Sequence, residues 1–281
     1  MRGKTIVITG ATSGIGAVAA RTLAERGARI LLVARDGARG GEMLGRLRAV
    51  NPEAAHGLYL ADLSRLEEMK RVGRAIAAAE SRIDVLMNNA GMISFRNERT
   101  VDGLEVMFAT NHMSYFVITS LLLERLRAAG GARIVSTASE AHRGRTLDFE
   151  RLEQGNGSRG YGVTKLCNIL FTRALARRIA GSGVTANCLH PGFVATRFGD
   201  NSRGAVRLGF QVAKRLFAIT PEQGAETLVF LASAAEVSNE TGGYYVRCAR
   251  GEPSREACDE ADARRLWELS ERLAGAPFGG A

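Results

Sequence analysis

The chain has 281 residues, 46% of them hydrophobic and 24% charged, which is enough for one large α/β domain or two small ones. Its four cysteines form no CxxC pair, and its four histidines show no ligand spacing with them, so we expect reduced thiols and no metal site. The formal charge of +9 would suit nucleic acid or an anionic small ligand, but the Arg residues are scattered among Glu and Ala without an aromatic stripe, which favours a solvated basic surface and no nucleic-acid partner.

The N-terminus goes directly into an apolar run and has no cleavage-site pattern. No apolar run approaches the roughly 18 residues of a membrane span. The longest candidate, "YFVITSLLLERL", is interrupted by Thr119, Ser120 and Glu124 and is typical of a buried helix. We therefore expect a cytoplasmic protein with no membrane span.

Short β-branched runs alternate with longer helical patterns along the whole chain. The predicted strands cover residues 4–9, 28–34, 56–61, 83–88, 132–139, 184–190 and 242–246. The predicted helices cover residues 17–27, 41–50, 65–80, about 111–129, about 159–181, 221–233 and about 259–274.

This alternation indicates right-handed βαβ units and a parallel sheet that is covered on both faces. The strands are almost continuously apolar, as expected for burial on both sides. The sequence contains neither a repeat nor a Pro/Gly/Ser-rich linker, so we predict one α/β domain over 1–281, a Rossmann-like doubly wound sheet of about seven strands. In such sheets ligands bind beyond the carboxyl ends of the strands.

The first strand ends in "TGATSGIG", which contains Gly10, Gly14 and Gly16. Glycines allow positive φ and close backbone approach in a turn, and the following helix start offers free N–H groups to a pyrophosphate. The spacing is two residues longer between the first glycines than in the common G-x-G-x-x-G. Taken alone, the motif predicts either a dinucleotide site or simply a tight turn.

Further motifs follow in order: "NNAG" at 88–91, "TN" at 110–111, "IVSTAS" ending at Ser139, "YGVTK" at 161–165 and "HPGFVAT" at 190–196. Together with "TGATSGIG" they resemble the short-chain dehydrogenase/reductase family from residue 4 to about 247. The tail "CDEADARRLWELSERLAG" and the wording "LHPGFVAT" resemble the retinol dehydrogenase-like and carbonyl reductase branch. The resemblance implies an enzyme that interconverts a carbonyl and an alcohol by hydride transfer with NAD(P)H.

The resemblance also implies a catalytic set. Tyr161 would be the general acid/base, Ser139 would orient the substrate oxygen, and Asn111 would support a water-linked proton relay. Lys165 would bind the nicotinamide ribose, and its ammonium one turn from Tyr161 would lower the tyrosine pKa from near 10. The residues alone leave alternatives open: a surface Tyr161–Lys165 pair, Ser136 in place of Ser139, and Asn111 as a helix-start residue.

For the cofactor, the resemblance implies contacts from Gly10, Thr12, Ser13, Gly14, Ile15, Gly16, Arg35, Asp62, Leu63, Asn89, Ala90, Gly91, Tyr161, Lys165, Pro191, Gly192, Val194 and Thr196. Asp62 would reach the adenine amino group, although "ADLSRLEE" also resembles a helix start, for which Ser64 is the stronger cap candidate. Asn88 and Asn89 are predicted to tie neighbouring strand ends together with their amides.

Arg35 follows the second strand, with Ala34 before it, where NAD-preferring relatives usually have an acid. A guanidinium pairs with the 2′-phosphate of NADP, whereas an acid binds the 2′-hydroxyl of NAD. The sequence therefore favours NADP(H) over NAD(H). Asp36 complicates this prediction, because it could turn inward and hold the ribose hydroxyls.

The polar segment between Ser139 and Tyr161 is predicted to form a loop over the site, in which His142 has no required role. Residues 193–220 are predicted to form a substrate lid whose apolar side chains either line a pocket for an apolar aldehyde or ketone or pack as a helix face.

A non-catalytic NADP(H)-sensing module on the same fold is the alternative function. The long helices that carry Asn111 and Tyr161 could pair in a homodimer or homotetramer, unless the loop before Tyr161 obstructs them.

Overall fold

The computed structural model describes residues 1–96, 98–152, 160–192 and 219–279. Its strands form one sheet in the order β3-β2-β1-β4-β5-β6-β7-β8. All neighbouring strands are parallel except β7 and β8. The strands are β1 (Thr5–Thr9), β2 (Arg29–Ala34), β3 (Gly57–Leu60), β4 (Val85–Asn88), β5 (Arg133–Thr137), β6 (Thr185–His190), β7 (Tyr244–Val246) and β8 (Ala249–Gly251).

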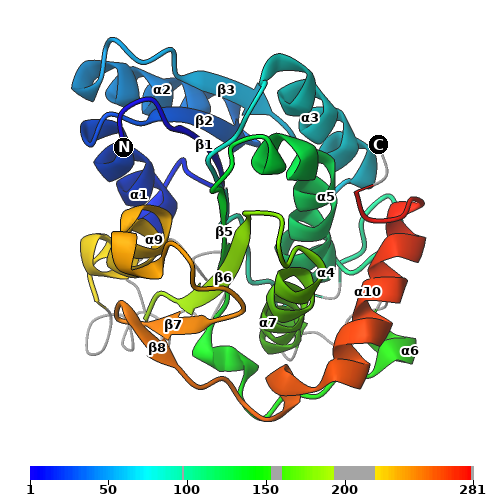
Figure 1. The fold of residues 1–281 in the computed structure, drawn as a ribbon. Helices are drawn as coiled ribbons and strands as arrows, with labels where there is room; N and C mark the ends of the chain where they lie inside the picture. Colours follow the sequence, from blue (N-terminus) through cyan, green and yellow to red (C-terminus); the bar gives the residue numbers. More distant parts are fainter. Residues whose placement is uncertain (97, 153–159, 193–218, 280–281) are drawn as a thin grey trace.

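Helices cover both faces of this sheet (Figure 1). One face carries α1 (Gly14–Glu25), α2 (Gly37–Val50) and α9 (Pro221–Ser233), and the other carries α3 (Leu66–Ala79), α5 (Ser114–Arg127) and α7 (Gly160–Arg178). The last helix, α10 (Glu260–Ala274), packs on the outside of α7. The predicted α/β doubly wound fold is confirmed, as is the C-terminal helix.

The strands are apolar on both sides because their side chains pack into two hydrophobic clusters, one on each face of the sheet. Val7 and Leu31 belong to the hydrophobic cluster under α3, α5 and α7, whereas Ile6, Ile8 and Ile30 belong to the cluster under α1, α2 and α9. All five side chains are fully buried. This explains why the sequence shows continuous apolar runs instead of a period of two.

The eighth strand was not predicted. Ala249–Gly251 is short and largely exposed, and it pairs antiparallel with β7 through a tight hairpin. Arg247 and Cys248 form that hairpin with φ values of 51° and 61°. Because non-glycine residues take up this left-handed conformation, the usual Gly or Asn signal of such a turn is missing from the sequence.

The long central helix begins five residues earlier than predicted. It runs from α4 (Val106–Phe108) through a π-helical segment, Ala109–Met113, into α5. Glu105 begins it by accepting a hydrogen bond from the Phe108 amide at 2.8 Å. By length and composition Val106–Arg127 could cross a membrane, but 78% of its apolar window is buried inside the protein. It is a core helix, as the sequence predicted, and the cytoplasmic location stays a prediction.

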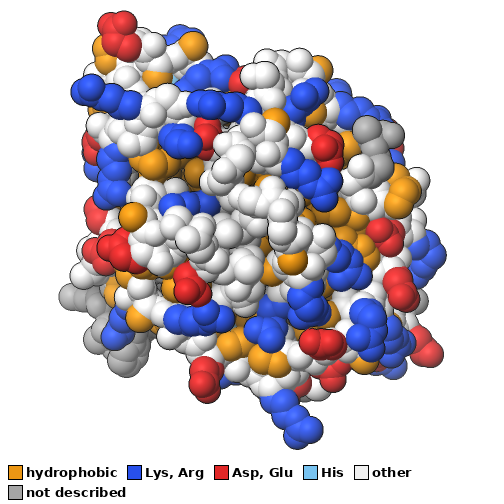
Figure 2. Space-filling model, viewed as in Figure 1, with side chains coloured by type: hydrophobic (Ala, Val, Ile, Leu, Met, Phe, Trp, Pro, Cys, Tyr) orange, Lys and Arg blue, Asp and Glu red, His pale blue; other side chains and the backbone are white. Residues whose placement is uncertain are grey.

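Figure 2 shows Lys and Arg side chains dispersed over the visible face, with Asp and Glu between them. Many form ion pairs within one helical turn, as in Lys70–Glu67 and Arg127–Glu124. Exposed pairs of this kind contribute little stability, but they break up the positive charge locally. This pattern agrees with the predicted solvated basic surface.

The carboxyl ends of β1, β4 and β5 are tied together by side chains. The Thr9 hydroxyl accepts hydrogen bonds from the Asn89 and Ala90 amides, each at 3.0 Å. The Asn89 side chain donates to the carbonyls of Thr9 and Gly10 and accepts from the Thr137 hydroxyl at 3.3 Å. The predicted role of Asn89 is therefore confirmed.

Asn88 behaves differently from its neighbour. Its amide donates to the Thr119 hydroxyl of α5 at 2.9 Å, so it ties β4 to a helix and not to another strand end. The prediction for Asn88 was wrong because successive residues of a strand point to opposite faces of the sheet.

We expect Thr9→Val to lower the free energy of unfolding by about 1–3 kcal/mol, because the half-buried Asn89 amide and the buried Ala90 amide lose their acceptor. Thr9→Ser keeps the hydroxyl and is the matched control, with a smaller loss. Urea denaturation of both variants measures the difference. Equal stability of the Val and Ser variants would show that this hydroxyl does not hold the strand ends together.

Candidate active site

The four residues predicted to be catalytic converge at the carboxyl ends of β4 and β5. Ser139 follows β5, Tyr161 and Lys165 lie in the first turns of α7, and Asn111 lies in the π-helical segment. Lys165 is anchored to the end of β5, and Asn111 is joined to α7 through Thr164. The surface-pair interpretation of Tyr161 and Lys165 is therefore wrong.

Lys165 is almost completely buried, with 2% of its surface exposed. Its ammonium donates a hydrogen bond to the Thr137 carbonyl at 2.9 Å. It also lies 5.5 Å from the centre of the Tyr161 ring and 5.9 Å from that of Tyr115. Burial lowers the pKa of Lys165 to about 7, because no carboxylate among the described residues compensates for its desolvation.

Tyr161 shows the opposite shift. Burial raises its pKa to about 12, and a hydrogen bond with the Ser139 side chain opposes this rise. The prediction that Lys165 lowers the Tyr161 pKa does not hold for the protein alone. Desolvation disfavours the phenolate and the ammonium alike, so it raises the pKa of Tyr161 and lowers that of Lys165.

Ser139 is placed by the end of its strand. It is extended, and its hydroxyl accepts the Ala141 amide at 3.2 Å, so it caps the 3₁₀ turn Glu140–His142. Its rival Ser136 lies inside β5, is fully buried, and finds no hydrogen-bond partner for its hydroxyl among the described residues. The geometry thus supports Ser139, which lies beside Tyr161.

Asn111 lies inside a helix and does not start one, so the helix-start interpretation is wrong. Its side chain accepts from the Met92 amide at 2.8 Å and donates to the Met92 carbonyl and to the Thr164 hydroxyl. A π turn is a common feature of functional sites, and here it directs a side chain off the ordinary helical register. The amide joins the segment after β4 to α7.

Thr164 was missed as a site residue. Its hydroxyl accepts from Asn111 at 3.1 Å and donates to the Tyr161 carbonyl at 2.8 Å. A sequence signal was present, because Thr164 is the residue with a hydroxyl group between Tyr161 and Lys165 in "YGVTK". Thr164 fixes the first turn of α7 against Asn111.

The first strand and α1 form a cradle suited to a dinucleotide. Gly10 and Gly14 have φ values of 70° and 56°, and a Cβ on Gly16 would lie 2.5 Å from the Gly10 carbonyl oxygen. The cap residue Ser13 makes no side-chain cap bond, and the first turn of α1 carries no acidic residue. The N-terminus of α1, which includes Ile15 and follows Thr12, therefore keeps its positive end for an anionic group such as a pyrophosphate.

At the end of β2, Arg35 is exposed, whereas Asp36 caps α2 by accepting the Arg39 amide at 3.1 Å. At the end of β3, Asp62 accepts from the amide and hydroxyl of Ser64. Both predicted caps of α3 are wrong. That helix begins at Leu66, whose amide donates to the Asp102 carboxylate at 2.9 Å.

Other predicted cofactor residues lie at the same edge of the sheet. Leu63 and Ala90 are buried, and a Cβ on Gly91 would approach Asn111 and Lys165 to 3.4 and 3.6 Å. Pro191 and Gly192 follow β6 directly. Val194, Thr196 and nearly all of the predicted lid, residues 193–218, lie outside the described residues.

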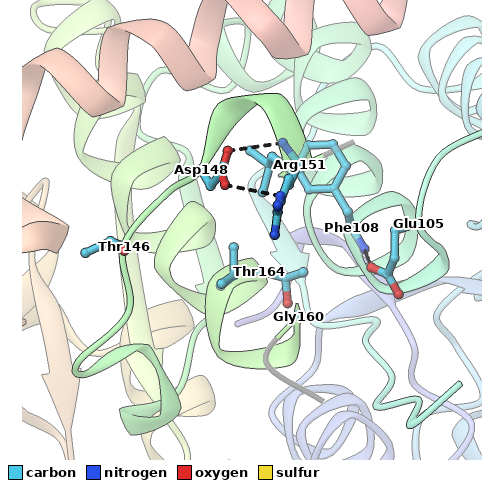
Figure 3. A pocket seen from close by; sticks show the side chains of 9 residues that line it. Glu105, Phe108, Thr146, Asp148, Arg151, Gly160 and Thr164 are labelled. Atoms are coloured by element: carbon cyan, nitrogen blue, oxygen red, sulfur yellow. Dashed lines mark hydrogen bonds and ion pairs between the residues drawn. The ribbon is translucent and has the colours of Figure 1, made fainter. Parts of the chain in front are cut away.

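A small cavity of about 40 Å³ lies beside the catalytic set (Figure 3). Glu105, Gly160 and Thr164 line it, and Asp148 and Arg151 face each other across an ion pair at its edge. Burial raises the pKa of Glu105, and one of its oxygens has no partner among the described residues. The cavity has room for water but not for a substrate, and its lining includes none of the four predicted catalytic residues.

Comparison with known proteins identifies the family. The family profile "short chain dehydrogenase" matches residues 4–206. The chain belongs to the short-chain dehydrogenase family. Membership makes the protein an oxidoreductase that uses NAD or NADP, and the resemblance inferred from the motifs is confirmed.

The retinol dehydrogenase-like character is confirmed as well. The chain is 38% identical to retinol dehydrogenase 14 of Mus musculus, over 98% of this chain and 87% of that protein. It is 36% identical to human retinol dehydrogenase 13, over 97% and 85% of the two chains. An uncharacterised protein from Mycobacterium paratuberculosis has a similar structure, with a TM-score of 0.78, 32% identity, and coverage of 99% of this chain and 95% of that one.

The buried lysine makes stability depend on pH. Between pH 7 and about 10.5 the unfolded short-chain dehydrogenase keeps a proton on Lys165 that the native protein lacks, so raising the pH favours the native state. We expect the stability of the wild type relative to Lys165→Met to rise by up to about 1.4 kcal/mol per pH unit in this range. Methionine is suitable because Asn168 still donates to the Thr137 carbonyl.

Urea denaturation at several pH values measures this difference. Lys70→Met, at a solvent-accessible lysine, controls for the loss of one positive charge. A stability difference between wild type and Lys165→Met that stays constant from pH 7 to 9.5 would show that Lys165 keeps an ordinary pKa.

Proposed function

We propose that the protein is an NADP(H)-dependent oxidoreductase that interconverts an apolar carbonyl compound and its alcohol, with Tyr161 as general acid/base. One observation carries the proposal: Tyr161 and Ser139 share a hydrogen bond at the end of β5, beside the buried ammonium of Lys165. A module that only senses the cofactor would have no use for this pair. The cofactor would supply or accept the hydride.

Tyr161 is suited to protonate the oxygen in the reductive direction. With a pKa raised to about 12, the phenol holds its proton at neutral pH and can deliver it to an alkoxide that forms beside it. Ser139 would orient that oxygen, since its hydroxyl already lies within hydrogen-bond reach of the phenol. In the oxidative direction the same phenol must first lose its proton.

Lys165 would serve two purposes. An ammonium has three donor hydrogens, and the Thr137 carbonyl uses one, so others remain for ribose hydroxyls. When protonated, it would also favour the phenolate of Tyr161. Because its pKa is lowered to about 7 in the protein alone, we expect a bound anionic cofactor to raise it again.

Asn111 would support the water-linked proton relay of the site. Its amide is fully buried and bridges Met92 and Thr164, so its position is fixed before any ligand binds. A water beside it could pass protons from Lys165. The nearby cavity bounded by Thr164 and Glu105 provides space for water within the same region.

The preference for NADP(H) rests on Arg35 and Asp36. Asp36 is engaged in capping α2, while Arg35 is exposed just after β2, where a 2′-phosphate would lie. A related structure from Beutenbergia cavernae, described as NAD(P) dependent, contains NADP at low occupancy; it has 30% identity and a TM-score of 0.70 over 88% of this chain and 96% of that one. For the substrate, the names of the retinol dehydrogenase relatives favour a long apolar alcohol or aldehyde.

Tyr161→Phe should lower kcat by about 10²–10⁴-fold, because the proton donor is removed while the ring is kept. NADPH affinity, followed by fluorescence titration, should change little. Tyr59→Phe, at a tyrosine on the edge strand β3, is the matched control. Near wild-type turnover by Tyr161→Phe on any aldehyde or ketone that the wild type reduces would refute the assignment of the proton donor.

Arg35→Ala should lower kcat/KM with NADPH by about 10–100-fold and leave kcat/KM with NADH within a few-fold, since a charge-assisted bond to the phosphate is lost. Arg46→Ala removes the same charge from an exposed position further along α2. Initial rates with both cofactors measure the effect. If the wild type turned over equally well or better with NADH, the cofactor preference would be wrong.

A further inference from the structure

Ser139 has to present its hydroxyl to Tyr161, and its backbone is fixed by the 3₁₀ turn Glu140–His142 that follows it. The Ser139 carbonyl accepts two hydrogen bonds from the end of that turn. The His142 amide donates at 3.1 Å, and the His142 Nδ1 atom lies 2.6 Å from the same oxygen. One histidine therefore closes the turn that carries the predicted oxygen-orienting serine.

Both ring nitrogens of His142 are engaged. Nε2 accepts a hydrogen bond from the Ser254 amide at 3.0 Å, so Nδ1 must carry the hydrogen that is donated to Ser139. The side chain is fully buried and lies edge-on to the Tyr244 ring, with centroids 5.4 Å apart. Burial lowers the pKa of His142, in agreement with this single neutral tautomer.

The same turn is held from other sides. Arg143 donates to the Glu252 carbonyl at 2.7 Å, and Tyr244 donates to the Glu140 carboxylate at 2.6 Å. The Glu140 amide donates to His190 Nδ1 at 3.3 Å, which links the turn to the end of β6. The turn is thus connected to β6, to β7 and to the segment after β8.

The turn also lies directly against the catalytic helix. A Cβ on Gly162 would lie 2.5 Å from the Ala141 carbonyl oxygen. Glycine is needed there for the turn to approach, and the first turn of α7 is thereby packed against residues 140–142.

We propose that His142 is a positioning residue of the active site, which fixes the carbonyl of Ser139 and so orients the Ser139 hydroxyl toward Tyr161. The proposal rests on the proposed function, because it gives His142 a role only if Ser139 and Tyr161 act on the substrate. The Ser254 backbone amide holds the His142 ring in place, and His142 in turn acts through Ser139. The segment after β8 therefore supports the chemistry without touching the substrate.

Three substitutions separate the two hydrogen bonds of His142. His142→Asn can keep a donor at the Nδ1 position and loses the contact with Ser254. His142→Gln can reach the Ser254 amide with its oxygen and loses the donor to Ser139. His142→Phe keeps an aromatic ring against Tyr244 and loses both bonds. His56→Phe is the matched control, because His56 is also buried and accepts a backbone amide, that of Ile30 at the start of β2.

Steady-state kinetics with an aldehyde that the wild type reduces, and thermal unfolding, are measured for each variant. We expect Gln and Phe to lower kcat by about 10–100-fold with KM for NADPH within about three-fold, because a small displacement of an orienting group costs that much. Asn should keep kcat within about three-fold of wild type although its Tm falls. His56→Phe should lower Tm and leave kcat unchanged.

The result that overturns the proposal is a kcat that follows Tm across all variants, or that falls equally in Asn and Gln, since either shows a purely structural role. Unchanged kcat in Gln and Phe would also overturn it. If Phe does not fold, the comparison of Asn with Gln gives the same decision. Tyr161→Phe in the same assay tests the proposed function by itself: an inactive Tyr161→Phe with active His142 variants rejects only the role of His142.

Discussion

The hydrogen bond from Lys165 to the Thr137 carbonyl is the constraint on which the rest of the site depends. It joins the second turn of α7 to the end of β5 inside the protein, where the ammonium finds no carboxylate among the described residues. A buried cation with only neutral partners is unstable as such, and its lowered pKa expresses that cost. The bond places Tyr161, one turn earlier on α7, beside Ser139.

The hydrogen bond between Lys165 and Thr137 depends on a fixed position of the end of β5 in the sheet. Thr9 and Asn89 join the ends of β1 and β4 through hydrogen bonds between side chains and backbone, and the Thr137 hydroxyl joins β5 to them by donating to the Asn89 side chain. These hydrogen bonds therefore connect the strand ends around the predicted cofactor cradle to Thr137, whose carbonyl holds Lys165. The nucleotide end and the chemical end of the site share one framework.

Much of this could be predicted, because glycine spacing, apolar strands and the order of the motifs are local properties of the sequence. The hydrogen bonds between residues far apart in the sequence could not be predicted from it. Asp102 caps a helix that begins 36 residues earlier, and the Ser254 amide meets His142 across 112 residues. The raised pKa of Tyr161 was missed for the same reason, since "YGVTK" shows the neighbouring lysine but not the burial that raises the tyrosine pKa and lowers the lysine pKa. The spacing of residues along a helix predicts which side chains are neighbours, whereas the burial of a side chain depends on the whole tertiary structure.

The π-helical segment allows one helix to meet two requirements, the burial of its apolar side chains and the placement of a polar side chain in the site. The helix from Val106 to Arg127 must bury an apolar face against the sheet, yet it must also direct the Asn111 amide toward Met92 and Thr164. One extra residue in the turn shifts the register locally, so the apolar pattern of α5 continues while Asn111 leaves it. Glu105 stabilises the start of this helix one turn earlier, because its carboxyl group accepts the Phe108 amide, and burial raises the pKa of that carboxyl. The Asn111 and Thr164 side chains are therefore held in place by neutral, directional hydrogen bonds.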